Sequence, residues 1–231
     1  MKIKGFYNPF RYLSRFEWGL WILSMTVVTV SYFFGARDGI LSLAASLLGV
    51  TALIFVAKGD VTGQVLTVVF SILYACVSWQ LQYYGEMITY LGMSAPIAAF
   101  SVVSWLRHPY AKDRSEVKME RLSRRDRVLT VVLALLVTAL FYPILRLLNN
   151  ASLGVSTLSV TTSFLAAYLL FRRSPYYALA YAANDVVLIV LWVIASLRDR
   201  SYLSMVACFL MFLCNDLYGF FNWIRIRRAQ E

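Results

Sequence analysis

The stretch YYALAYAANDVVLIVLWVIASLRDRSYLSMVACFLMFLCNDLYGFFNWI, residues 176–224, decides the fold class of this chain. It holds two long apolar runs separated by the short charged connector 198–200. A helix rises about 1.5 Å per residue and the hydrocarbon layer is about 30 Å thick, so each run is long enough to cross a bilayer. The runs also lack the alternation of apolar and polar residues that is typical of membrane β-strands. The stretch therefore predicts two transmembrane helices.

Further apolar runs of similar length precede this stretch. The predicted spans are Trp18–Phe34, Gly39–Ala57, Val61–Trp79, Met87–Trp105, Val128–Leu145, Leu153–Phe171, Tyr176–Leu197 and Tyr202–Ile224. They take up most of the 231 residues, and 60% of the residues are hydrophobic. The sequence predicts an all-α integral membrane protein with eight transmembrane helices and no room for an extramembrane catalytic domain.

The basic residues indicate how the spans are oriented. With eight spans, all of the 22 Lys and Arg residues except Arg37, Arg146, Arg198 and Arg200 fall on the side that holds both termini. Positively charged connectors tend to stay in the cytoplasm, so both termini are predicted to be cytoplasmic. The net charge of +10 is then explained by topology and by contacts with anionic lipid head groups, and no nucleic-acid partner is expected.

The N-terminal segment and the cysteines argue against a cleaved signal peptide and a metal site. Lys2 and Lys4 precede an aromatic segment without a small-residue cleavage site, so residues 1–16 are predicted to lie at the interface rather than to form a signal peptide. Cys76, Cys208 and Cys214 all lie within spans without metal-binding spacing. They are predicted to pack as small apolar residues, and no cofactor or metal site is expected.

A weak internal repeat divides the spans into two sets. The fourth span ends in SWLR (104–107) and the eighth in NWIR (222–225), while the second leaves through VAK (56–58) and the sixth through LFR (170–172). Two three-helix units run parallel when one helix lies between them, as is typical of transporter repeats. The predicted organisation is 1–38 as N-terminal segment and extra helix, 39–106 as first bundle, 107–127 as basic loop, 128–150 as linker helix, 151–224 as second bundle and 225–231 as tail.

Polar side chains inside the spans are the main functional signal, because such groups usually face a bundle interior or a water-filled cavity. They recur at helical spacing on the third, fourth, seventh and eighth spans, and no such stripe marks the first or fifth. Two Asn-Asp pairs, Asn184-Asp185 and Asn215-Asp216, fall near mid-membrane. The candidate substrate-binding residues are Gln64, Tyr74, Glu86, Tyr90, Tyr181, Asn184, Asp185, Trp192, Asn215, Asp216, Tyr218, Asn222 and Trp223.

The charge balance around these residues suggests the chemistry of the ligand. No Lys or Arg lies within the predicted spans to neutralise Asp185 or Asp216, so a ligand with hydroxyl groups or a positive charge would supply what the protein lacks. A flat heteroaromatic ring stacks well on Trp or Tyr, and a cationic ring gains further attraction. Trp192 is the better tryptophan candidate, since Trp79, Trp105 and Trp223 lie close to predicted interfaces.

Three segments resemble a known family. YYGEMITY (83–90), NDVVLIVLW (184–192) and especially NDLYGFFNW (215–223) are similar to the PnuC family of nicotinamide riboside transporters. The resemblance implies a fold like that of the SWEET sugar transporters, and uptake of a ribosylated nicotinamide, a precursor of NAD, by a uniporter in the bacterial cytoplasmic membrane. It also implies that Asn184, Trp192, Asn215 and Trp223 contact ribose and pyridinium. Relatives in the wider family carry thiamine or deoxynucleosides, which remain alternative substrates.

Other classes of function fit the sequence less well. The chain has no GxxxxGK phosphate loop for an energised pump, and its one histidine, His108, lies in a predicted loop, which disfavours a lipid-modifying enzyme. A receptor role without translocation remains an alternative. Transport could also be coupled to protons through Glu86, Asp185 or Asp216, and the protein could assemble into a homo-oligomer.

Overall fold

The computed structural model describes residues 8–34, 40–80, 84–110, 116–150, 152–197 and 203–231. Within these ranges, eight helical spans are long and apolar enough to cross a membrane, which confirms the predicted fold class. They are α1 Arg15–Phe34, α2 Ile40–Ala57, α3 Val61–Gln80, a span built from α4 Tyr84–Thr89, η2 Tyr90–Ser94 and α5 Ala95–Arg107, then α6 Arg124–Leu147, α7 Leu153–Phe171, α8 Tyr177–Ser196 and α9 Leu203–Gln230. A short helix, η1 Pro9–Tyr12, precedes α1.

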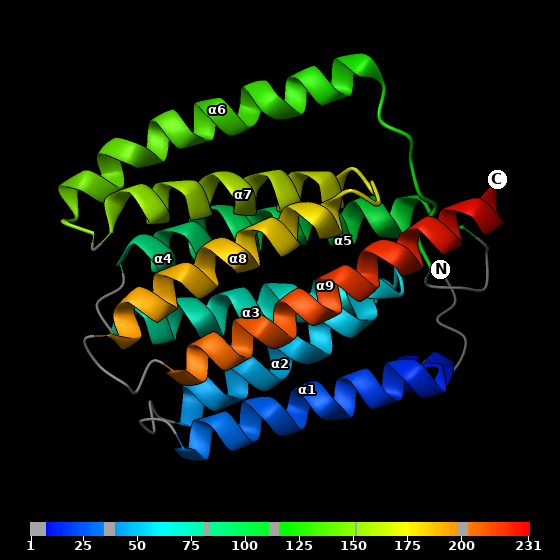
Figure 1. The fold of residues 1–231 in the computed structure, drawn as a ribbon. Helices are drawn as coiled ribbons and strands as arrows, with labels where there is room; N and C mark the ends of the chain where they lie inside the picture. The colour runs from blue at the N-terminus through cyan, green and yellow to red at the C-terminus, as the bar shows by residue number, and fades with distance from the viewer. Residues whose placement is uncertain (1–7, 35–39, 81–83, 111–115, 151, 198–202) are drawn as a thin grey trace.

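The helices that surround the centre of the molecule form a closed ring. Going round it, α2 packs on α3, α3 on α5, α5 on α7, α7 on α8, α8 on α9, and α9 again on α2. Helix α6 lies outside this ring against α7, and α1 lies outside it against α2 and α9 (Figure 1). We refer to α2, α3 and α4–η2–α5 as the first half-ring and to α7, α8 and α9 as the second. The two halves meet where α5 contacts α7 and where α2 contacts α9.

A glycine and an aspartate make the tight turn between α2 and α3. Gly59 has φ of +68°, a conformation that costs a residue with a side chain about 1 kcal/mol or more. Asp60 then accepts a hydrogen bond from the backbone N–H of Thr62 at 2.8 Å, which satisfies one of the free amides at the start of α3. The turn holds the two helices antiparallel and close together.

The fourth span is interrupted just before Pro96. The residues just before it, Tyr90–Ser94, form a π-helical turn. Proline cannot donate a backbone hydrogen bond, and a wider turn is one way for a helix to absorb that loss. Such turns occur often at functional sites, and Tyr90 and Ser94 both face the centre of the ring.

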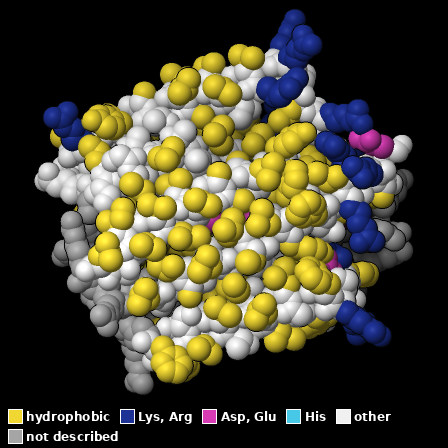
Figure 2. All heavy atoms as spheres, viewed as in Figure 1, with side chains coloured by type: hydrophobic (Ala, Val, Ile, Leu, Met, Phe, Trp, Pro, Cys, Tyr) yellow, Lys and Arg dark blue, Asp and Glu magenta, His cyan; other side chains and the backbone are white. Residues whose placement is uncertain are grey.

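Basic side chains gather at one end of the ring, which we call the basic end. It is the end where α2, α5 and α7 finish and where the chain ends after α9, and Figure 2 shows Lys and Arg concentrated there. Helix α9 continues to Gln230, beyond the predicted end at Ile224. The predicted basic loop 107–127 also packs more closely than expected, because Val117 is fully buried and its carbonyl accepts a hydrogen bond from Gln230.

Candidate functional site

The ring encloses a cavity of about 70 Å³ near its middle. The first half-ring contributes small, hydroxyl and aromatic residues, and the second contributes amide, carboxyl and further aromatic residues. The lining residues are Gly49, Ala52, Leu53, Val56, Thr67, Phe70, Ser71, Tyr90 and Ser94 from the first half, and Ser163, Leu170, Tyr181, Asn184, Asp185, Phe209, Phe212 and Asp216 from the second. The cavity therefore brings together Tyr90, Tyr181, Asn184, Asp185 and Asp216 of the residues that the sequence singles out.

Asn184 on α8 is held by hydroxyl groups of α7. Its Oδ1 accepts hydrogen bonds from Thr162 Oγ1 at 2.8 Å, Ser163 Oγ at 3.0 Å and Ser159 Oγ at 3.4 Å. The side-chain carbonyl is thereby fixed toward α7. The amide NH₂ group is left as the end of Asn184 that can donate hydrogen bonds to a bound molecule.

Two carboxyl groups meet beside Asn184. Asp185 of α8 and Asp216 of α9 are each 3% exposed, and both line the cavity. Oδ2 of Asp185 is buried without a hydrogen-bond partner among the described residues, and so is Oγ of Ser71 on the opposite wall. Buried polar atoms are almost always paired, so two such atoms facing one cavity indicate that a polar molecule belongs there.

Aromatic rings cover much of the remaining wall. Phe70 of α3 lies 5.9 Å from Tyr90 and 6.1 Å from Phe212 between ring centroids, both with edge-on geometry. Phe212 in turn packs edge-on at 5.5 Å against Phe209. The walls thus combine flat apolar faces with two acidic groups, and among the described lining residues none is Lys or Arg.

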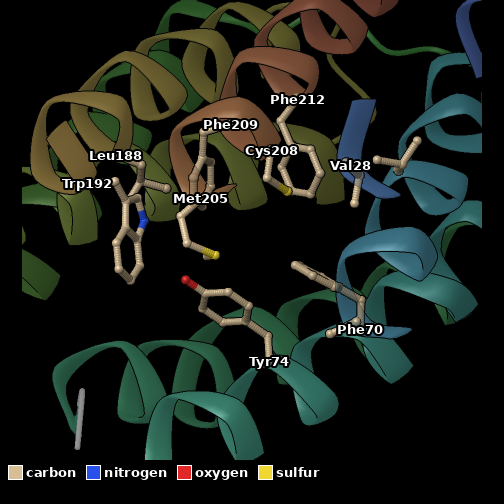
Figure 3. Packing of buried hydrophobic residues seen from close by; sticks show 11 residues of the cluster. Val28, Phe70, Tyr74, Leu188, Trp192, Met205, Cys208, Phe209 and Phe212 are labelled. Atoms are coloured by element: carbon tan, nitrogen blue, oxygen red, sulfur yellow. The ribbon is translucent and has the colours of Figure 1, made fainter. Parts of the chain in front are cut away.

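Toward the end opposite the basic end, an apolar cluster lies over the cavity. Figure 3 shows Tyr74 of α3 pointing toward Met205 and Trp192, with Leu188 beside them. Trp192 is 3% exposed and packs in this cluster, and the ring of Tyr74 lies 4.4 Å from that of Tyr90 in a tilted arrangement. Both residues were expected at the ligand, and both lie one layer beyond the cavity lining.

Other predicted site residues on α9 make contacts away from the cavity. Asn215 Nδ2 donates to Ser24 Oγ of α1 at 3.0 Å, and Tyr218 donates to Glu17 Oε1 at 2.7 Å. Asn222 donates to the carbonyl of Ala57 at 2.8 Å, at the end of α2. These side chains hold α9 against α1 and α2.

The remaining predicted site residues also lie outside the lining. Trp223 donates to the carbonyl of Val56 at 2.8 Å and is completely buried. Gln64 is buried on α3 with an unpaired Nε2 among the described atoms, and Glu86 is half-buried on α4. Neither of these two lines the cavity.

Sequence reasoning missed the polar face of α1 and the hydroxyl groups of α7. Glu17 and Ser24 are 2% and 0% exposed although α1 lies outside the ring. Their spacing of seven residues, which places them on one helix face, was the available signal. Ser163 was hidden because Ser and Thr are common in membrane helices for packing reasons alone.

The family of the chain follows from its sequence over the same ring. The family model described as nicotinamide mononucleotide transporter matches residues 39–225. The chain belongs to this family. The match begins at α2 and ends within α9, so it covers the ring and α6 and leaves out α1. As a member of the nicotinamide mononucleotide transporter family, the chain is a membrane transporter and not an enzyme.

Individual relatives cover almost the whole chain. A protein of Neisseria mucosa named nicotinamide riboside transporter PnuC is 25% identical over 217 residues, which are 92% of this chain and 82% of that protein. A protein of the same name from Haemophilus influenzae is 23% identical over 208 residues, covering 90% of this chain and 89% of its own length. The resemblance to PnuC found in the sequence is thereby confirmed.

A solved structure has the same fold. The crystal structure described as that of the vitamin B3 transporter PnuC superposes with a TM-score of 0.81 at 24% identity. The similarity covers 95% of this chain and 94% of that one. The fold of almost the whole chain is therefore one already seen in a solved structure.

Proposed function

We propose that this transporter imports nicotinamide riboside by facilitated diffusion. The names of the two relatives support this substrate. The observation that carries the proposal is the meeting of Asp185 and Asp216 in a cavity walled by aromatic rings. Nicotinamide riboside is a cationic aromatic ring joined to a sugar, and each part of it finds complementary chemistry in this cavity.

The pyridinium ring suits the acidic and aromatic side of the site. A cation beside an aromatic face gains about 0.5–2 kcal/mol, and a nearby carboxylate adds Coulombic attraction in a medium of low polarity. Phe70, Tyr90 and Phe212 supply the faces, and Asp185 and Asp216 supply the acid. A phosphorylated ligand would find no cationic side chain among the described lining residues.

The sugar suits the polar groups around Asn184. Ribose hydroxyls both donate and accept hydrogen bonds, so they pair with the NH₂ group of Asn184 and with the free Oδ2 of Asp185. Ser71 and Ser163 add hydroxyls on opposite walls. Partners that already exist before binding reduce the entropy that the ligand must lose.

Transport proceeds in this proposal by alternating access between the two half-rings. Ligand pockets commonly have volumes of about 300–1,000 Å³, so a cavity of about 70 Å³ must expand to admit a nucleoside. Units 39–106 and 151–224 would rock against each other, with 128–150 as linker. The basic end would face the cytoplasm, in accordance with the positive-inside rule, and the protein would lie in the bacterial inner membrane.

Uptake into liposomes tests the proposal. Purified protein in liposomes should equilibrate radiolabelled nicotinamide riboside without an ion gradient, whereas protein-free liposomes should not. Unlabelled nicotinamide riboside, thiamine, a deoxynucleoside and nicotinamide mononucleotide serve as competitors. If only thiamine or only the deoxynucleoside competes, that compound replaces nicotinamide riboside as the assigned substrate. The absence of any uptake would refute translocation of these compounds. The matched control is Leu135→Ala, a change at an exposed position on α6.

A further inference from the structure

The two carboxyl groups of Asp185 and Asp216 line the same small cavity, and each side chain is 3% exposed. An ionised carboxylate is only an acceptor, so two ionised groups could not hydrogen-bond to each other. One proton shared between them would make one group a donor and the other an acceptor. The pair would then hold one proton and one negative charge.

The surroundings of the pair favour this state over two charges. The titratable groups that face it are Tyr177 and Tyr181 of α8, Tyr90 of η2 and Cys208 of α9, with Glu86 of α4 beyond Tyr90. Among these described neighbours none is basic. Two negative charges in contact repel strongly where polarity is low, and here no cation offsets the repulsion.

We propose that Asp185 and Asp216 act as one monovalent acid, which shares a proton and presents a single negative charge to the transported molecule. The inference rests on the proposed function, because it explains how the site is matched to a ligand with one positive charge. The free Oδ2 of Asp185 is the oxygen that remains available to that ligand. A neutral nucleoside would leave the charge of the pair uncompensated.

Asparagine substitutions distinguish a shared proton from two separate charges. Asn has the shape of a protonated Asp and can donate a hydrogen bond, so Asp185→Asn or Asp216→Asn alone still leaves one carboxylate. Each single variant should keep uptake of nicotinamide riboside within about tenfold of wild type, while the double variant should lose at least about a hundredfold. If either single variant loses as much as the double variant, or if the double variant transports normally, the inference is wrong.

Proton release on binding provides a second readout. A pair that already carries one negative charge should release no proton when a cation binds at pH 7, measured with an indicator dye in weak buffer. A pair that is neutral before binding would release one proton per ligand, which would overturn the inference. The double variant should also lose the preference for nicotinamide riboside over its neutral dihydro form.

The outcomes separate the inference from the substrate assignment. If the wild type carries thiamine and not nicotinamide riboside, and the variants follow the same pattern with thiamine, the substrate proposal fails and the shared proton stands. If nicotinamide riboside is carried and the single variants behave like the double variant, only the shared proton fails. If the wild type binds no cationic ligand, both fail.

A second, independent observation concerns the basic end of the ring, where two tryptophans bridge the half-rings in the same way. Trp223 of α9 donates to the carbonyl of Val56 at the end of α2 at 2.8 Å, and Trp105 of α5 donates to the carbonyl of Leu170 at the end of α7 at 3.4 Å. The two indole rings lie 5.7 Å apart and are 0% and 2% exposed. Each bond closes one of the two seams between the half-rings.

The sequence repeat relates the two bonds. Trp105 and Trp223 occupy the same place in SWLR and NWIR, and Val56 and Leu170 occupy the same place in VAK and LFR. The last helix of each half-ring therefore donates an indole N–H to the first helix of the other. Val56 and Leu170 also line the cavity, so the bonds lie directly between the site and the basic end.

The geometry points to a paired lock: both indole bonds must break before the cavity opens at the basic end. Buried hydrogen bonds in a membrane have no water to replace them, so their loss destabilises the closed state directly. Trp→Phe removes the donor and keeps an aromatic ring. The shorter bond, made by Trp223, should contribute more than the longer one.

Cysteine labelling tests the lock. In a background without Cys76, Cys208 and Cys214, Ser71→Cys places a thiol in the cavity wall, and a membrane-impermeant maleimide is applied from the basic side in inside-out vesicles. Trp223→Phe should raise the labelling rate by about fivefold and Trp105→Phe by about twofold, as expected for the loss of about 1 and 0.4 kcal/mol. The double variant should exceed both. Trp79→Phe, at an exposed position toward the other end, is the matched control.

Unchanged or lower labelling in the folded variants would overturn the lock. Folding is checked by size-exclusion chromatography in detergent. If Trp223→Phe does not yield monodisperse protein, Trp105→Phe carries the test alone, and labelling equal to that of Trp79→Phe then refutes the proposal.

Discussion

The two half-rings have the same construction at the basic end and different chemistry at the cavity. At the basic end each uses a tryptophan to bond the other, through Trp105 and Trp223. At the cavity the second half-ring supplies Asn184, Asp185 and Asp216, while the first supplies hydroxyl groups and rings. Residues that close the ring are thus repeated, whereas the amide and carboxyl groups of the cavity come from the second half-ring only. The difference teaches that the repeat accounts for the packing of the helices, and that the acidic chemistry of the cavity has to be read from the second half.

Among these single substitutions, the largest expected effect comes from removing an amide of the second half. Asn184→Ala deletes the NH₂ group offered to the sugar and removes the acceptor of the Ser163 hydroxyl. Uptake of nicotinamide riboside, measured as kcat/KM in liposomes, should fall by about 10- to 100-fold, since leaving a buried hydrogen-bonding group without its partner costs about 1–3 kcal/mol.

The matched change in the first half should have little effect. Thr67 also lines the cavity, but its hydroxyl already donates to the carbonyl of Gly63 at 2.8 Å. Thr67→Val should change kcat/KM by less than about threefold, because no bond to the ligand is lost. Equal losses in Asn184→Ala and Thr67→Val would show that the two halves share the binding role.

A smaller effect is expected at Gly49, where α2 packs closely on α9. A Cβ on Gly49 of α2 would lie 2.9 Å from the ring of Phe212 on α9 and 3.0 Å from that of Phe70. Gly49→Ala should lower the free energy of unfolding in detergent by about 1–2 kcal/mol, because overpacking outweighs the higher helix propensity of alanine. Gly154→Ala has open space around its Cβ and should be neutral or stabilising. If Gly49→Ala is more stable than wild type, α2 and α9 pack less tightly at this position than the distances indicate.

A weaker effect should follow from removing a charge that anchors α1, a helix that packs outside both half-rings. Glu17 is buried, accepts a hydrogen bond from Tyr218 and forms a salt bridge with Lys58 at 3.2 Å. Glu17→Gln should reduce the free energy of unfolding by about 1 kcal/mol, since Lys58 is partly exposed and can return to water. Uptake should stay within about twofold of wild type. A large loss of uptake with unchanged stability would make α1 part of the transport machinery.

The smallest effect is expected at the surface of the basic end. Arg121 and Glu231 form an exposed salt bridge at 2.6 Å, and the hydrogen bond from Arg121 lowers the pKa of Glu231 below its ordinary value. Any stability from this pair is present above the ordinary pKa of the carboxyl and disappears as pH falls through the lowered one. Arg121→Ala should leave the melting temperature at pH 7 unchanged. A measurable decrease would show that the end of α9 stabilises the ring.

The spans were predictable because length and hydropathy determine them almost alone. Helix α7 has the predicted bounds, Leu153–Phe171. The extension of α9 to Gln230 was missed, since residues beyond the membrane follow contacts with the loop rather than hydropathy.

The site was predictable only in part, because a helical stripe does not say which neighbour it faces. Successive residues of a helix differ by about 100° in direction, so Asp216 faces the cavity while Asn215 faces α1. Trp192 and Tyr74 pack in the apolar cluster one layer beyond the cavity lining. How deep a side chain lies in the ring, and which helix it contacts, both depend on how the helices pack together. The sequence of a single helix does not contain that information.

The acidic wall of the cavity also bears on what can leave by the same path. Two carboxyl groups and, among the described lining residues, no cationic side chain face a molecule that enters from either compartment. If a phosphate were attached to the imported compound inside the cell, the product would carry negative charge and that wall would disfavour its binding. The proposed passive carrier would then retain its cargo inside the cell without a pump.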